Sequence, residues 1–133
     1  MRNIDKLYIS LGLAWLIGSA AFGTWLGASG HPNFAQSHAH IGLLGFVASV
    51  LFGLTHKAWP TLRESRLALP QLVVYEAGTV ILLTGKVMID ASGQPNPFLM
   101  IGAPIVIIGG AMFLWLFVRS PATASVPTLA PAE

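Results

Sequence analysis

Long apolar stretches separated by short polar connections run through most of the chain. They predict helices at about residues 7–27, 38–57, 70–89 and 97–118. Each stretch is near the roughly 20 residues that a helix needs to cross a ~30 Å hydrocarbon layer. We therefore expect an all-α membrane protein with one four-helix transmembrane domain over residues 1–119. Residues 120–133 are rich in Pro, Ala, Ser and Thr and should be disordered.

Composition agrees with this pattern and narrows the chemistry. Hydrophobic residues make up 54% of the 133 residues and charged residues only 9%, which is too few polar side chains to cover a soluble globule. The chain contains no cysteine, so disulfides, thiolate-held clusters and c-type haem attachment are excluded. The basic residues are scattered among the connections, which argues against nucleic-acid binding.

The positions of the basic residues predict an orientation. Lysine and arginine lie before the first helix, in the second connection and after the fourth helix, at Arg2, Lys6, Lys57, Arg63, Arg66 and Arg119. The first connection has none. The positive-inside rule then puts both termini in the cytoplasm. In this orientation His31, His38 and His40 lie at the outer face of the membrane and His56 at the inner face.

The second predicted helix has an unusual face. At about 100° per residue, one narrow stripe collects His38, Gly42, Gly45, Ser49, Gly53 and His56, whereas His40 points nearly the other way. A face with so few side chains suits either a closely packed neighbouring helix or a flat cofactor. Histidines at membrane depth favour a binding site. Both interpretations stay open at this stage.

Other polar residues in the spans have two interpretations each. Glu76 is either a carboxyl group that is neutral through burial or hydrogen-bonded to a neighbouring helix, or, with Tyr75 and His56, part of a proton path. Lys86 either extends to the lipid headgroups or pairs with an anionic group at the level of the outer histidines. His31 is either a solvated loop residue or a third metal ligand that would suit copper or zinc.

Residues 37–60, SHAHIGLLGFVASVLFGLTHKAWP, resemble the tenth helix of haem-copper oxidase subunit I. The resemblance rests on His38-Ala39-His40, on Gly45 and Gly53 within the apolar run, and on the closing Trp59-Pro60. The same stretch is similar to nitric-oxide reductases and to small NnrS-like membrane proteins. In the oxidase family twelve helices form three four-helix arcs, and this chain resembles one arc.

The resemblance implies a homotrimer that rebuilds the ring, with a b-type haem held between protomers. His38 of one protomer and His40 of the next would be the axial ligands. Gly42, Gly45 and Ser49 would line the cofactor, and Lys86 would pair with a propionate. No histidine triad of the oxidase copper site with its tyrosine occurs in the chain, so the resemblance implies neither oxygen reduction nor proton pumping.

These observations predict a multi-pass haem protein of the bacterial inner membrane. Its function would be electron transfer or gas-responsive redox chemistry, with lipid, further copies of the chain and a redox partner as its contacts. Whether the protein catalyses a reaction is left open. One alternative is a membrane protein that binds copper or another metal through the outer-face histidines. Another is a non-catalytic accessory subunit.

Overall fold

The computed structural model describes residues 3–121, and this part of the chain is helical without strands. It contains four helices long and apolar enough to cross a membrane. These are α1 (Ile4–Ser29), a second span over Pro32–Ala58, α5 (Ala68–Ser92) and α6 (Pro97–Arg119). The prediction of four apolar membrane-spanning helices is confirmed. The disorder predicted for the tail concerns residues that, from 122 onward, lie outside the described part.

The second span is built from four consecutive helical segments. They are η1 (Pro32–Phe34), α2 (Ala35–His40), η2 (Ile41–Ala48) and α3 (Ser49–Ala58). The segment η2 is a π-helix, in which each turn is wider than in an α-helix, and such segments often occur near functional sites. A uniform step of 100° per residue is therefore only an approximation for this span.

The second connection differs from the expected polar loop. A short helix, α4 (Pro60–Arg63), begins directly after the second span with proline in its first turn. Proline is tolerated there because the first N–H groups of a helix have no intrahelical partner. The helix α5 begins at Ala68, and Pro70 is tolerated in its first turn for the same reason. At its other end α5 continues through Asp90 to Ser92, which were expected in the outer turn.

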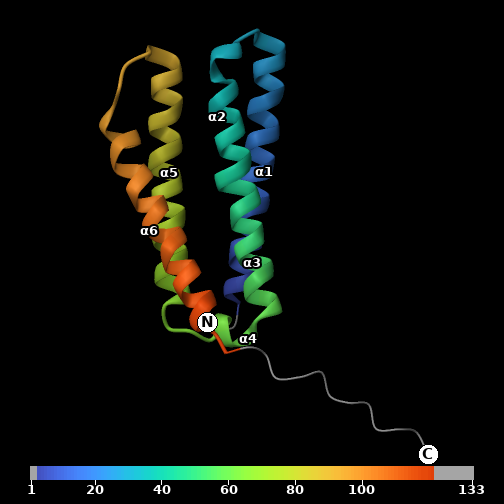
Figure 1. Ribbon diagram of the computed structural model, residues 1–133. Coiled ribbons are helices and arrows are strands. Elements are labelled where there is room, and N and C mark those ends of the chain that lie inside the picture. The colour runs from blue at the N-terminus through green and yellow to red at the C-terminus, as the bar shows by residue number, and fades with distance from the viewer. Residues whose placement is uncertain (1–2, 122–133) are drawn as a thin grey trace, which may run out of the picture.

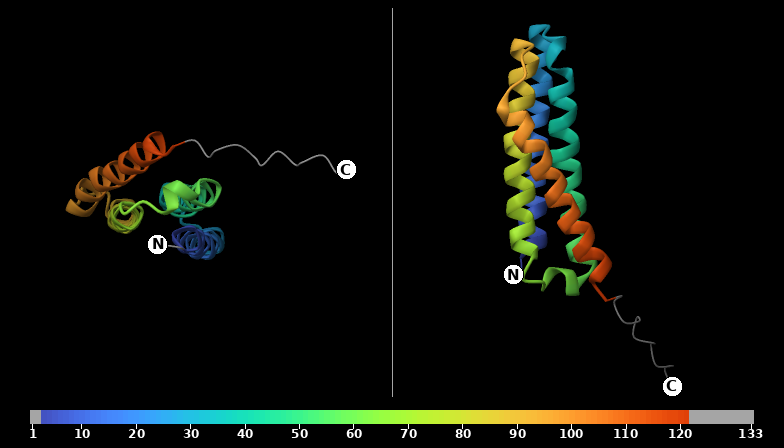
Figure 2. Two further views of the ribbon diagram at one scale, coloured as in Figure 1. Left: turned by 90° about the horizontal axis from the view of Figure 1, so that it is seen from below. Right: turned by 60° about the vertical axis from the view of Figure 1, so that its left-hand side comes forward.

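The four spans form two helical hairpins, α1 with the second span and α5 with α6 (Figures 1 and 2). Within the second hairpin the helices approach closely at glycines. A methyl group added at Gly78 would lie 2.8 Å from the Val106 nitrogen, and one at Gly109 would lie 2.7 Å from the Tyr75 Cα. Small residues at such crossings are typical of membrane helices. The described chain begins and ends at the same end of the bundle (Figure 1).

Side-chain hydrogen bonds connect the two hairpins along the length of the bundle. The residues of this polar seam are Tyr8, Trp15, Asn33, Ser37, Ser49, Gln71, Tyr75, Glu76 and Asp90. Near the terminal end, the Tyr8 hydroxyl donates to Gln71 Oε1 at 2.6 Å, and Gln71 Nε2 donates to the Gly109 carbonyl oxygen at 3.1 Å. A buried polar group in hydrocarbon needs such a partner. The polar groups of the seam therefore find their hydrogen-bond partners within it, and these hydrogen bonds also join the two hairpins.

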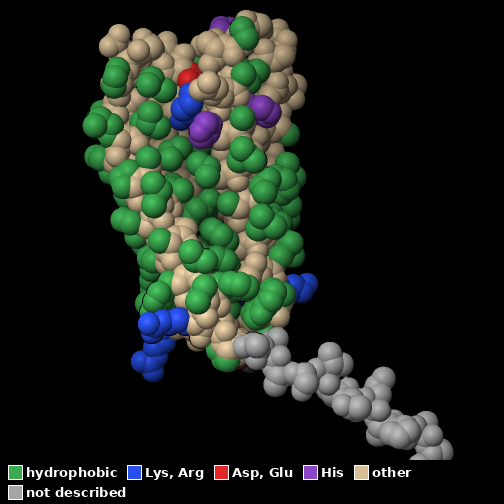
Figure 3. All heavy atoms as spheres, viewed as in Figure 1, with side chains coloured by type: hydrophobic (Ala, Val, Ile, Leu, Met, Phe, Trp, Pro, Cys, Tyr) green, Lys and Arg blue, Asp and Glu red, His purple; other side chains and the backbone are tan. Residues whose placement is uncertain are grey.

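The outer surface of the bundle is apolar. Large hydrophobic side chains are exposed on all four spans, for example Ile17, Leu43, Val73 and Ile107. Figure 3 shows hydrophobic side chains over the middle of one face, with lysine and arginine at the end that carries the chain termini. Histidines and a lysine beside an acidic side chain lie toward the opposite end. This distribution fits a surface in contact with lipid.

Candidate functional site

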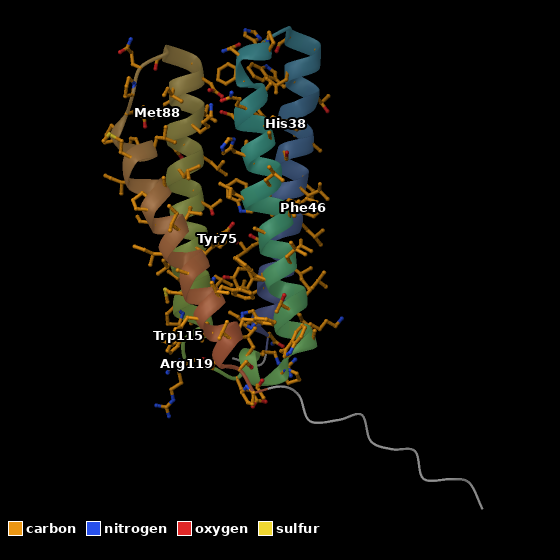
Figure 4. The ribbon with its side chains drawn as sticks, viewed as in Figure 1. His38, Phe46, Tyr75, Met88, Trp115 and Arg119 are labelled. Atoms are coloured by element: carbon orange, nitrogen blue, oxygen red, sulfur yellow. The ribbon has the colours of Figure 1, made fainter. Side chains whose placement is uncertain are left out.

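His38 lies in α2, toward the end of the bundle opposite the chain termini (Figure 4). Its half-buried ring packs against α1 at Gly23, where an added methyl group would lie 2.7 Å from the His38 Cε1. Its Nδ1 is 3.4 Å from the Ser19 hydroxyl oxygen. Gly23 thus leaves space for the imidazole ring of His38, and the Ser19 hydroxyl lies within hydrogen-bonding distance of its Nδ1.

His40 follows two residues later and has a different environment. Its Nδ1 is 2.8 Å from the carbonyl oxygen of Gln36. A carbonyl oxygen only accepts hydrogen bonds, so Nδ1 carries the proton and Nε2 of the neutral ring carries the lone pair. Within residues 3–121, neither the His40 Nε2 nor the His38 Nε2 makes a hydrogen bond. The His38 Nε2 lies against α1, because it would be 3.2 Å from a methyl group added at Gly23. The His40 ring is the one that does not have such a contact with Gly23.

His31 does not join these two histidines. Its ring stacks on Trp25 with 5.1 Å between ring centroids, and its Nδ1 is 2.8 Å from the Ser29 hydroxyl oxygen. Over the described residues, no three or more side chains of His, Cys, Asp or Glu are grouped so that they could hold a metal ion. The expected alternative of His31, His38 and His40 around one ion is thus not assembled within one chain.

The glycine stripe of the second span packs against α1. A methyl group added at Gly45 would lie 2.6 Å from the Trp15 Cγ, and one at Gly53 would lie 2.7 Å from the Ile9 Cγ1. At Gly42 the nearest α1 atom would be the Ser19 Oγ, at 3.7 Å. Of the two interpretations of the stripe, close helix packing is the one present in the single chain. The expected contact of Gly42, Gly45 and Ser49 with a cofactor stays a prediction.

Lys86 is buried and forms an ion pair with Asp90, one turn later in α5. Asp90 also accepts hydrogen bonds from the Ser37 backbone nitrogen at 3.1 Å and from the Ser37 hydroxyl at 2.6 Å. Asn33 Nδ2 donates to the Asp90 carbonyl oxygen at 3.0 Å. Asp90 of α5 therefore connects the two hairpins at Ser37, the residue that precedes His38 in α2. The pairing of Lys86 with a propionate stays a prediction.

Glu76 bridges three helices in the interior of the bundle. Its Oε2 accepts a hydrogen bond from Trp15 Nε1 of α1 at 3.0 Å, and its Oε1 accepts one from the Ser49 hydroxyl of α3 at 2.6 Å. The interpretation of Glu76 as hydrogen-bonded to neighbouring helices is confirmed. The adjacent Tyr75 donates instead to the Leu44 carbonyl oxygen in η2, at 3.0 Å.

His56 is fully buried near the terminal end of the bundle, among aromatic rings. Its ring stacks on Tyr8 at 5.8 Å and meets the edge of Phe113 at 5.6 Å between centroids. Among residues 3–121, neither ring nitrogen has a hydrogen-bond partner. No hydrogen bond between described residues joins His56 to Tyr75 or Glu76, so the proton path stays a prediction.

Trp15 and Asp90 are among the residues of these clusters that were not identified from the sequence. Trp15 resembles any other apolar residue of α1, and nothing in the pattern indicates that it faces Glu76. Asp90 had a usable signal, since a lysine and an aspartate four residues apart pair on one face of a helix. That signal was lost because the helix was expected to end before Asp90.

Comparison of the chain with protein-family models, with curated proteins and with solved structures finds no match. The functional argument therefore rests on the chain's own geometry. Two histidines, His38 and His40, each have an Nε2 without a hydrogen bond among residues 3–121, and the Glu76 carboxyl group is held by hydrogen bonds within an apolar helix.

Proposed function

We propose that this protein is a membrane b-type haem protein that transfers electrons or responds to a gas through its haem. The observation that carries the proposal is the hydrogen bonding of the His38 and His40 rings. Each ring has its Nδ1 next to a polar atom of the chain and its Nε2 without a hydrogen bond. Metal-binding histidines typically have this arrangement, because the second nitrogen fixes the orientation of the ring.

Haem suits these two histidines better than a free metal ion. His38 packs against α1, whereas His40 bonds back to its own helix, so the two rings do not converge on one position. A bare copper or zinc ion needs three or four ligands from the protein. A haem brings four equatorial nitrogens and requires only one or two axial ligands. Two histidines from different copies of the chain meet that requirement.

In our proposal His40 of one copy and His38 of the next hold one haem iron, and three copies close into a homotrimer. Closed symmetry repeats the same interface three times and so creates up to three haem positions. Ligation by two histidines favours electron transfer because it leaves no open position on the iron. A gas would bind only after one of the histidines dissociates.

We further propose that the protein lies in a bacterial inner membrane with both termini in the cytoplasm. The end of the bundle that holds the termini also carries Lys57, Arg63 and Arg119, whereas η1 and its connection to α1 contain no basic residue other than histidine. This asymmetry supports the orientation through the positive-inside rule. His38 and His40 then face the outer side.

The test is a reduced-minus-oxidised absorption spectrum of the purified full-length protein, produced with added haem. We expect a low-spin b-type spectrum in wild type and its loss in His38→Ala and in His40→Ala. His31→Ala is the matched control, because His31 lies at the same end but is stacked on Trp25, and it should keep the spectrum. Wild-type protein without haem would contradict the proposal, and metal analysis would then test the copper alternative.

A further inference from the structure

We propose that a groove between α1 and α5, centred on Glu76, binds the headgroup of a membrane-soluble quinol. The groove has a volume of about 470 Å³. Its wall is formed by Leu11, Ala14, Trp15 and Gly18 of α1 and by Glu76, Ala77 and Val80 of α5. Pockets of roughly 300–1,000 Å³ that combine apolar walls with a few polar groups are typical of small-molecule sites. The site is separate from the outer histidines and does not require that haem is bound.

Glu76 is the polar group that this groove offers to a ligand. Its two carboxyl oxygens each accept one hydrogen bond, from Trp15 and from Ser49, which hold the group in place. An ionised carboxylate oxygen has two lone-pair positions, so each oxygen can accept a second hydrogen bond. The side chain is only half-buried and lines the groove. A hydroxyl group in the groove would therefore find an oriented acceptor.

The groove is open to the surroundings of the bundle beside Gly18, an exposed position on α1. A methyl group added at Gly18 would have no other heavy atom within 4 Å, unlike the added methyl groups at Gly12, Gly23 and Gly45. The space beside Gly18 is thus not filled by any of the residues that the structure describes. Trp15 lines the same groove, so a planar ring bound there would contact an aromatic side chain.

The depth of Glu76 selects the class of ligand. Glu76 is eight residues after Ala68, the first residue of α5, or roughly 12 Å along the helix at 1.5 Å per residue. The headgroup of a phospholipid stays outside the hydrocarbon layer and does not reach this level. A fatty acid would bring a second carboxylate next to Glu76, which is unfavourable. A quinol carries its hydroxyl groups on a planar, lipid-soluble ring and meets both requirements.

Quinol binding would also reduce the cost of placing Glu76 in the membrane. A carboxylate at this depth is expensive and is found where it has partners or a function. Trp15 and Ser49 supply two hydrogen bonds, and the quinol hydroxyl supplies a third that is charge-assisted. The groove would thus give the protein direct access to a redox-active molecule of the membrane.

The test measures equilibrium binding of decylubiquinol, kept reduced, to the full-length protein in lipid nanodiscs, with empty nanodiscs subtracted. We expect saturable binding and no saturable binding of decylbenzene, which has the same tail without hydroxyl groups. Gly18→Leu fills the groove and should weaken binding at least tenfold. Gly110→Leu is the matched control, because an added methyl group there also has no neighbour within 4 Å but lies outside the groove; it should bind as wild type does.

Glu76→Gln gives a second, independent readout. The glutamine keeps the size of the side chain and can still accept from Trp15, while the Ser49 hydroxyl can accept from the amide. We expect about tenfold weaker binding because the hydrogen bond to the quinol loses its charge. Equal binding of decylbenzene, unchanged binding in Gly18→Leu, or no saturable binding to wild type would overturn the proposal. These results do not depend on haem content, so the haem proposal stands or fails separately.

Discussion

Replacement of Glu76 by leucine should loosen the contact between the two hairpins. The substitution removes the shared acceptor of the Trp15 and Ser49 hydrogen bonds. Hydrogen bonds between membrane helices contribute about 0.6 kcal/mol on average and up to about 1.7 kcal/mol. Two such bonds predict a loss of roughly 1–3 kcal/mol in the free energy of unfolding. Ser49→Ala removes one of the bonds and should cost about half as much.

The two substitutions should not be additive. In the Glu76→Leu background Ser49 has already lost its acceptor, so Ser49→Ala should then cost little or slightly stabilise the protein. The assay is reversible unfolding in mixed micelles of mild detergent and sodium dodecyl sulfate, followed by circular dichroism for the four proteins of the cycle. Thr84→Ala is a control, because Thr84 is exposed and bonds only within its own helix. Fully additive costs of Ser49→Ala and Glu76→Leu would refute the hydrogen bond between these residues.

Two further substitutions test the surroundings of His38 and His40. Gly23→Ala places a methyl group 2.7 Å from His38 Cε1, so it should displace that ring and lower haem occupancy in the absorption spectrum. Gly27→Ala is the control, because the added methyl group meets no atom within 4 Å, and it should leave haem occupancy unchanged. If haem occupancy falls in both variants, the contact between Gly23 and His38 does not explain the effect. Lys86→Met should loosen haem retention without changing the oligomer in size-exclusion chromatography with light scattering. It should also destabilise the protein, because Asp90 loses its ion-pair partner, and unchanged haem retention would exclude Lys86 from the haem site.

The membrane spans could be predicted because they depend on a property of the sequence that acts locally. An apolar run of about 20 residues predicts a span whatever its neighbours are, and the ends of α6 were expected within one residue. The ends of α5 were less predictable. Pro70 was expected to be the first residue of this helix, yet it is tolerated within the first turn and the helix begins at Ala68. Asp90 was expected in a loop, yet it is paired with Lys86 within the last turns.

The candidate sites were predictable only in part, because their chemistry depends on contacts between distant segments. The spacing of the glycines in the second span indicated a smooth face, but the sequence did not specify that Trp15 and Ile9 cover it. The π-helix η2 has no local signature in residues 41–48. Glu76 stood out as an acidic residue inside a span, whereas its partners Trp15 and Ser49 had to be found in the structure.

The most direct test of the central claim is complementation between His38→Ala and His40→Ala chains. Each variant alone should lack the low-spin b-type spectrum, because every haem position would miss one axial ligand. In mixed oligomers a position is complete where the His40 of a His38→Ala chain faces the His38 of a His40→Ala chain.

In a trimer that carries both variants, about a third of the haem positions are complete, because one of its three junctions joins the required pair of chains. The measurement is haem content and the reduced-minus-oxidised spectrum of oligomers that carry both of two different affinity tags, one on each variant. Our account predicts that these oligomers regain the low-spin spectrum while each variant alone does not. Mixed oligomers without the spectrum would contradict a haem shared between two copies of the chain.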